Sequence, residues 1–99
     1  MFARLTYIEA EPRTDIDRVA QPMLPMAESM AGCRGLLCLG DRTTGRALAI
    51  AFYEDRDALH DSGEAARTLT PELLEQTGAR LDRIEEYEVV FTSRQIRIG

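Results

Sequence analysis

The order of apolar patterns along the chain predicts an α+β fold in which strand, helix, strand, strand, helix and strand follow one another. Three observations predict it: four short runs show strand patterning, two longer segments show helical periodicity, and a glycine-containing turn joins the two middle strands. A chain of 99 residues supports one hydrophobic core, so we expect a single domain over residues 1–99.

The first strand is predicted over residues 2–10, where apolar and polar side chains interleave. A helix is then expected to begin at Thr14, which forms a capping-box-like pair with an aspartate three residues on, and to end at Gly32. Two prolines remove backbone donors, so this helix should kink or break near residues 21–25. Apolar residues at three- and four-residue steps form its buried face: Ile16, Val19, Ala20, Met23, Ala27 and Met30.

Two short apolar runs, residues 35–41 and 47–53, are predicted to form the middle strands. The segment between them has turn residues at both ends and includes Gly45, which favours a hairpin. A helix is the alternative for residues 47–53, because this run contains three alanines, but its length and the adjacent turn favour a strand.

The second helix is expected to open at Asp55 and to be weakened at Gly63. Thr70, followed by Pro71, predicts that a shorter helix restarts there and ends at Gly78. Its expected inward-facing residues are Leu73, Leu74 and Leu81.

The last strand is predicted over Ile84–Arg94, followed by a tail, Gln95–Gly99, that retains Ile96 and Ile98. For this order of elements, the simplest closed solution is a four-stranded antiparallel sheet with both helices on one face. This is the ferredoxin-like βαββαβ arrangement.

The middle strands predict a homodimer, because residues 36–39 and 48–52 are apolar on both faces of the sheet. The helices cover only one face, and exposing several large side chains on the other, at ~25 cal/mol per Å², costs several kcal/mol. The sheet of a second subunit would cover that face around a two-fold axis. The alternative is that residues 70–83 fold across it.

Composition excludes several classes of partner. The net charge is −5 and no basic run stands out, so neither nucleic acid nor an anionic membrane is an expected partner. No apolar stretch approaches the length of a membrane span, and residues 1–20 lack the pattern of a secretion signal. Cys33 and Cys38 would lie ~16 Å apart along a strand, too far for a disulfide. Reduced cysteines are typical of a cytoplasmic protein.

Four short motifs occur in a fixed order: Gly32-Cys33-Arg34-Gly35, Asp41-Arg42-Thr43-Thr44-Gly45, Phe52-Tyr53-Glu54-Asp55 and Glu86-Tyr87-Glu88-Val89. In their order and spacing the chain resembles, over nearly its whole length, the antibiotic biosynthesis monooxygenase-like domains of the dimeric α/β-barrel superfamily. The resemblance implies that two ferredoxin-like subunits pair into a dimeric α/β-barrel.

The resemblance also implies an activity, because the family includes cofactor-independent oxygenases of aromatic polyketides and haem-degrading oxygenases. The haem-degrading type relies on an Asn in the first strand and on a Trp and a His in the second helix. Thr6 and Ser62 stand where that Asn and Trp would fall, and the chain has no Asn or Trp at all. Haem degradation is therefore not expected, and neither a cofactor nor a metal is implied.

Cofactor-free oxygenation needs an apolar pocket, a base to make the substrate anion, and a cation or donor to hold it. The candidate catalytic residues are His60 as base, Arg67 as cation and Tyr53 as hydroxyl donor. Substrate would lie between helices and sheet, against Thr6, Met23, Met26 and Met30.

Each candidate also has a plain structural interpretation. His60 can be a solvated side chain, Arg67 can pair with Glu64, and the tyrosines and methionines can simply pack. His60 with Glu64 supplies only two ligands, so no metal site is predicted. Cys38 is expected to be an inert buried thiol.

Two functions therefore remain open. One is a monooxygenase-type enzyme acting on a hydrophobic or aromatic small molecule. The other is a non-catalytic dimeric module that binds a hydrophobic ligand or serves as an accessory protein. A water-accessible pocket with a titratable group favours the first, and a filled, dry core favours the second.

Overall fold

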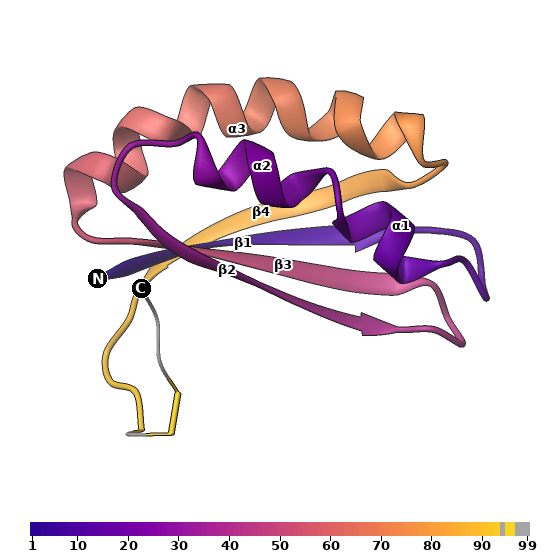
Figure 1. The fold of residues 1–99 in the computed structure, drawn as a ribbon, viewed down its shortest axis with the longest axis horizontal. Helices are drawn as coiled ribbons and strands as arrows, with labels where there is room; N and C mark the ends of the chain where they lie inside the picture. Colours follow the sequence, from indigo (N-terminus) through magenta and orange to yellow (C-terminus); the bar gives the residue numbers. More distant parts are fainter. Residues whose placement is uncertain (94, 97–99) are drawn as a thin grey trace.

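The computed structural model describes residues 1–93 and 95–96, and it has the predicted order of elements (Figure 1). They are β1 (Phe2–Glu9), α1 (Ile16–Ala20), α2 (Met23–Glu28), β2 (Cys33–Asp41), β3 (Arg46–Tyr53), α3 (Arg56–Gln76) and β4 (Arg80–Glu88). The four strands are antiparallel in the order β2-β3-β1-β4, and the helices lie on one face. The ferredoxin-like α+β fold is thus confirmed. The predicted positions Arg94 and Ile98 lie outside the described residues.

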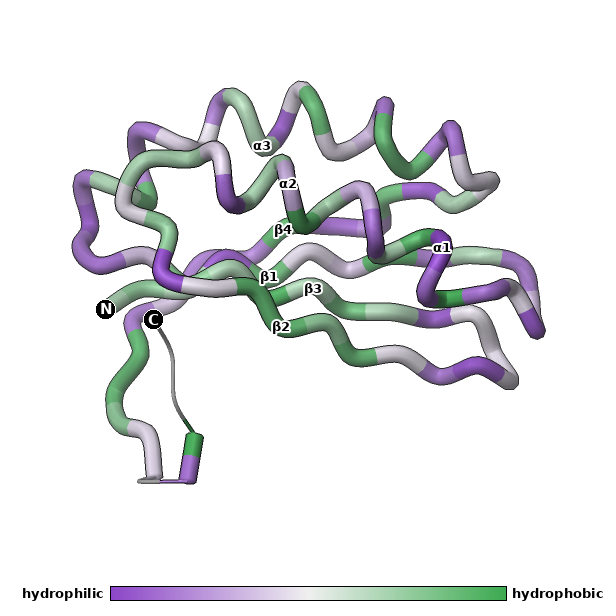
Figure 2. The backbone as a smooth tube through the Cα atoms, viewed as in Figure 1, coloured by the Kyte–Doolittle hydropathy of each residue, from purple (hydrophilic) through white to green (hydrophobic). Residues whose placement is uncertain are grey.

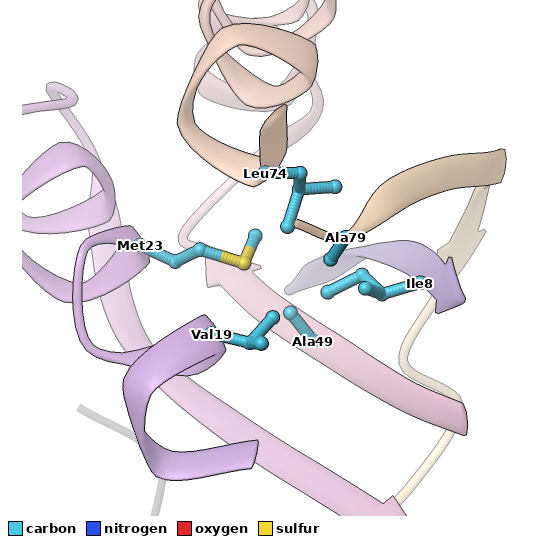
Figure 3. Packing of buried hydrophobic residues seen from close by; sticks show 6 residues of the cluster. All are labelled: Ile8, Val19, Met23, Ala49, Leu74 and Ala79. Carbon is cyan, nitrogen blue, oxygen red and sulfur yellow. The ribbon is translucent and has the colours of Figure 1, made fainter. Parts of the chain in front are cut away.

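Register decides which side chains face the helices. Thr6 of β1 lies opposite Ala49 of β3 and opposite Ile84 of β4, so these residues share the inner face. The same face carries Ile8, which is buried beneath the helices. The core cluster joins sheet and helices through Ile8, Val19, Met23, Ala49, Leu74 and Ala79 (Figure 3).

The predicted break in the first helix is confirmed, since α1 and α2 are separate short helices. The expected cap is wrong by one residue. The side chain of Asp15, not Thr14, accepts hydrogen bonds from the first-turn amides of Asp17 and Arg18. The Thr14 hydroxyl instead donates to the carbonyl oxygen of Glu11, which closes the turn after β1.

The expected restart of a helix at Thr70 is wrong, because α3 continues through Pro71 without interruption. Leu74 is fully buried in the core, and Thr70 is buried with its hydroxyl 3.9 Å from the sulfur of Met26. Because Thr70 and Leu74 both pack against the core, the residues before and after Pro71 stay in one helix. Tertiary packing thus overrides the sequence signal for a helix restart.

The last strand also differs from its predicted bounds, since β4 begins at Arg80 and ends at Glu88. Leu81, expected on a helix, lies opposite Ile8 in the sheet. The strand ends early because its neighbour β1 begins at Phe2, which pairs with Glu88. Beyond that pair, the described residues add one backbone hydrogen bond, from the Val89 amide to the carbonyl oxygen of Met1.

The opposite side of the sheet, which we call the outer face, is uncovered within the described residues. Figure 2 shows that β2 and β3 are hydrophobic over most of their length. Residues 70–83 form the end of α3 and the start of β4 and do not cross this face. By register, its apolar members are Ala3, Leu5, Tyr7, Leu37, Leu39, Leu48, Ile50, Phe52 and Tyr87.

Cys33 and Cys38 are both free thiols. The expectation that Cys38 is buried is wrong, because β2 is an edge strand and leaves this side chain exposed. Partial desolvation nevertheless raises the pKa of the Cys38 thiol. Across the described residues, no helix combines the length and apolarity that crossing a bilayer requires.

Candidate functional site

A buried arginine on β1 organises the space between sheet and helices. Arg4 is 2% exposed, and its Nε donates to Oε2 of Glu86 at 2.9 Å. Its Nη1 donates to the hydroxyls of Tyr53 at 3.1 Å and Ser62 at 3.0 Å. Its Nη2 donates to the carbonyl oxygen of Leu59 at 2.6 Å. The guanidinium therefore ties β1 to β3, β4 and α3.

This network satisfies a charge that is otherwise costly to bury. Arg4 uses its donors on two hydroxyls, one carbonyl and one carboxylate, and Glu86 supplies the opposite charge. The guanidinium carbon also lies 5.1 Å from the centre of the Tyr53 ring, within cation–π range. The positive charge of Arg4 therefore lies close to both the ring and the hydroxyl of Tyr53.

A cavity of about 20 Å³ lies beside this network, between α2, α3 and the sheet. That volume holds about one water molecule. The Tyr53 hydroxyl approaches the sulfur of Met30 at 3.6 Å, so its hydrogen has only a weak acceptor in the cavity. The lining is mostly apolar and includes Arg4, Thr6, Met23, Met26, Met30, Leu36, Ala49, Ala51, Tyr53, Ala66 and Thr70.

The structure brings together only part of the site expected from the sequence. The hydroxyl and wall residues, namely Thr6, Tyr53, Met23, Met26 and Met30, all line the cavity. His60 and Arg67 do not, because both are exposed on α3. The expected base and the expected cation therefore lie outside the cavity.

Arg67 does approach Arg4 from the outside of α3. A Cβ added at Gly63 would lie 3.1 Å from both Nη atoms of Arg67 and 3.4 Å from Nη2 of Arg4. Because Gly63 has no side chain, the guanidinium groups of Arg67 and Arg4 can both lie close to this position of α3. A second cation near Arg4 adds positive potential to the network.

Sequence reasoning missed Arg4, although a signal for it was present. The alternation of β1 places residues 4, 6 and 8 on one face, and Ile8 on that face is clearly apolar. An arginine two positions from a buried threonine on the same face is a buried cation that needs partners. The pattern predicts its burial, whereas its partners are distant in sequence.

A larger hollow of about 510 Å³ lies on the outer face, at the hairpin end of the sheet. Its floor includes Tyr7, Leu39 and Leu48, and charged residues surround it: Glu9, Asp41, Arg46, Asp82 and Arg83. The Arg83 guanidinium carbon is 3.8 Å from the centre of the Tyr7 ring. Among the residues the structure describes, no group of three or more potential metal ligands gathers here or elsewhere.

The fold is shared with a solved structure. A Deinococcus radiodurans protein described as a putative antibiotic biosynthesis monooxygenase superposes with a TM-score of 0.68, covering 95% of this chain and 97% of that chain at 16% identity. The resemblance stated from the motifs is therefore confirmed at the level of the fold. No family model matches the sequence.

The curated relatives are longer proteins of Mycobacterium tuberculosis. Uncharacterized protein Rv2557 is 31% identical over 98% of this chain and 44% of its own length. Uncharacterized protein Rv2558 is 28% identical over 95% of this chain and 41% of its own length. The chain thus spans less than half the length of these relatives.

Proposed function

We propose that this chain is a monooxygenase-type enzyme that binds a small planar aromatic compound in the cavity beside Arg4 and Tyr53. In the reaction, O₂ is the oxidant and a ring CH₂ of the substrate becomes a carbonyl. One oxygen atom enters the substrate, and the other leaves as water with the two hydrogens. The structural neighbour from Deinococcus radiodurans supports this class of chemistry by its description.

One observation carries the proposal: a tyrosine hydroxyl polarised by a buried arginine has, among the residues the structure describes, a thioether as its acceptor. A substrate oxyanion is a much better acceptor than the Met30 sulfur, so its arrival would strengthen the hydrogen bond. The positive charge of Arg4 would stabilise the same oxygen in this dry site. Tyr53 would donate the hydrogen bond and Arg4 would supply the positive charge. The substrate would enter as its anion, because the expected base, His60, lies outside the cavity.

The cavity must open to admit a ring system, because about 20 Å³ holds only one water molecule. Its wall is suited to this, since Met23, Met26 and Met30 all come from the short, proline-interrupted segment around α2. Methionine side chains rearrange at low cost because they are unbranched. Opening would therefore involve α2 rather than the sheet.

A second candidate function is a non-catalytic module that binds a hydrophobic ligand. It is favoured by the small cavity and by its lining, in which Arg4 is the only charged residue. Without a base at hand, a ligand could be held without being oxidised. Both candidates share the binding step and differ in oxygen consumption.

A homodimer accompanies both candidates. Leu37 and Leu39 on the outer face are 46% and 49% exposed in the single chain, and burial against a second sheet would remove them from water. The two free thiols, in turn, are consistent with a reducing, cytoplasmic location.

The test uses 1,8-dihydroxyanthrone, whose central CH₂ can become a carbonyl, with calorimetry for binding and an oxygen electrode for turnover. We expect Tyr53→Phe to weaken binding about tenfold, the value of one charge-assisted hydrogen bond. The control Tyr87→Phe removes a tyrosine hydroxyl from the outer face instead and should leave the affinity for the ligand unchanged. Binding without oxygen uptake would favour the non-catalytic module, and equal binding by both variants would overturn the site.

A further inference from the structure

The chain continues beyond β4 with residues that form strands well but have no strand beside them. Val89, Val90 and Phe91 follow Glu88 directly, and Val90 and Phe91 are 84% and 85% exposed. β-branched and aromatic residues of this kind favour extended backbone. Figure 1 shows this segment leaving the sheet on the side opposite the helices.

Within residues 1–93 and 95–96, the segment has no partner strand. Glu88 pairs with Phe2 at the start of β1, and the Val89 amide donates to the carbonyl oxygen of Met1 at 2.9 Å. The ladder ends there because the neighbouring strand, β1, begins at Phe2. The two most exposed large apolar side chains of the described residues thus follow directly after a strand whose neighbour has stopped.

The outer-face hollow of about 510 Å³ lies at the other end of β1. Residues 2–6 of β1 separate the two sites, which is ~17 Å at strand spacing. The floor of the hollow is apolar, with Leu39 and Leu48 side by side in adjacent strands. It is large enough to receive an aromatic side chain, and part of its rim is acidic, with Glu9, Asp41 and Asp82 beside Arg46 and Arg83.

We propose that residues 89–93 of one copy lie in the outer-face hollow of a second copy, with Phe91 against Leu39 and Leu48. This clasp rests on the homodimer proposed above. A two-fold axis parallel to the sheets and perpendicular to the strands stacks two outer faces in opposite directions. In this arrangement, the segment that leaves one sheet at the Glu88 end lies over the hairpin end of the other sheet, where the hollow is.

Charge fits the same arrangement. Residues 89–99 contain Arg94 and Arg97 and no acidic residue, in a chain whose net charge is −5. Residues 89–93 carry no charge themselves, so the attraction would come from Arg94 and Arg97, which follow them in the sequence, toward a rim that has more acidic than basic residues.

Truncation of the anchor gives the first test. Phe91→Ala should raise the dimer dissociation constant about 10- to 100-fold, as expected when a large apolar side chain is no longer buried. Thr92→Ala, one residue along the same segment, should leave the constant unchanged. Sedimentation equilibrium over micromolar concentrations measures both. Equal constants for Phe91→Ala and the unmodified chain would overturn the clasp.

Cross-linking gives the second test and identifies the copy that is bound. In a background with Cys33→Ser and Cys38→Ser, Phe91→Cys combined with Leu48→Cys should form a covalent dimer under mild oxidation. Phe91→Cys combined with Leu24→Cys, whose side chain is more exposed than that of Leu48 but lies on the helix side, should not. A bond between residues 91 and 48 within one chain would overturn the proposal, because the segment would then cover its own sheet.

The outcomes separate the clasp from the dimer. An unmodified chain that sediments as a monomer at micromolar concentration contradicts the dimer and the clasp together. A dimer that persists unchanged after Phe91→Ala, without cross-linking between 91 and 48, contradicts only the clasp.

Discussion

The guanidinium of Arg4 donates a hydrogen bond to the hydroxyl of Tyr53 at 3.1 Å, and the two side chains come from adjacent strands beneath α3. This contact joins the buried charge of the protein to the cavity on which the proposed function depends. It also gives Arg4 a structural role that can be measured without any ligand.

Removing the buried cation should destabilise the fold strongly. Arg4→Met removes the donor to the hydroxyls of Tyr53 and Ser62, and it leaves the Leu59 carbonyl with the Ser62 hydroxyl as its side-chain donor. We expect the free energy of unfolding to fall by about 3 kcal/mol, because several buried polar groups lose partners at once. Urea unfolding measures it. The control Arg67→Met removes an exposed arginine and should cost less than about 0.5 kcal/mol; equal losses would refute the assigned network.

Two glycines with the same backbone conformation should respond differently to alanine. Gly45 has φ 83° and Gly78 has φ 80°, so both substitutions carry about 1 kcal/mol of backbone strain. A Cβ at Gly45 would also collide with the carbonyl oxygens of Ala10 and Glu11, whereas nothing lies within 4 Å at Gly78. Gly45→Ala should therefore lower the midpoint of thermal unfolding clearly more than Gly78→Ala. Equal shifts would contradict the packing of the hairpin turn on the chain after β1.

The outer face should be sensitive to charge, and the helix layer should not. Leu37→Glu places a carboxylate on the outer face, and Leu24→Glu makes the same change on α2 at nearly equal exposure, 46% against 49%. If the outer face is buried in a dimer, only Leu37→Glu should produce a monomer, because an unpaired buried charge is costly. Light scattering after gel filtration measures the mass. A dimer that tolerates Leu37→Glu would place the interface elsewhere.

Tyr7 should titrate late in alkaline solution. Its hydrogen bond with Glu85, together with the nearby negative charge, raises the pKa of Tyr7 above the ordinary value of 10.0. The folded protein holds this proton more tightly than the unfolded chain does. The resulting contribution to stability is present below pH 10 and is lost as the pH rises through the folded-state pKa.

Absorbance of tyrosinate near 295 nm follows this titration, and the difference from Tyr7→Phe isolates the Tyr7 signal. Glu85→Gln should lower the pKa of Tyr7 because the charge and the carboxylate acceptor are removed together. An unchanged titration in Glu85→Gln would show that another group raises the pKa.

The order of helices and strands along the chain and the placement of both helices on one face could be predicted because apolar spacing records burial directly. The alternation of β1 and the continuous apolar runs of β2 and β3 do so in this chain. The extent of α3 and β4 could not. Whether a helix passes through Pro71 depends on what holds Leu74, and where β4 stops depends on where β1 begins. Both depend on contacts between residues that are far apart in the sequence, which no short stretch of sequence reveals.

The candidate site divides in the same way. Tyr53, Thr6 and the methionines follow from strand and helix spacing, so the sequence places them in the cavity wall. The prediction of His60 rests on its residue type and on a position at the flank of the apolar stripe, and the helix directs this flank to solvent. Arg4 emerges only from its partners Glu86, Ser62 and Tyr53, which are 49 to 82 residues away.

The most direct test of the central claim uses the methionine methyl groups as reporters. With ¹³C-methyl methionine, titration with 1,8-dihydroxyanthrone should shift the signals of Met26 and Met30, which line the cavity beside Tyr53, and leave exposed Met1 unchanged. The Tyr53→Phe variant should need about ten times more ligand for the same shift. Saturable binding that leaves Met26 and Met30 unmoved would contradict the account, because the ligand would then lie outside the Arg4 cavity.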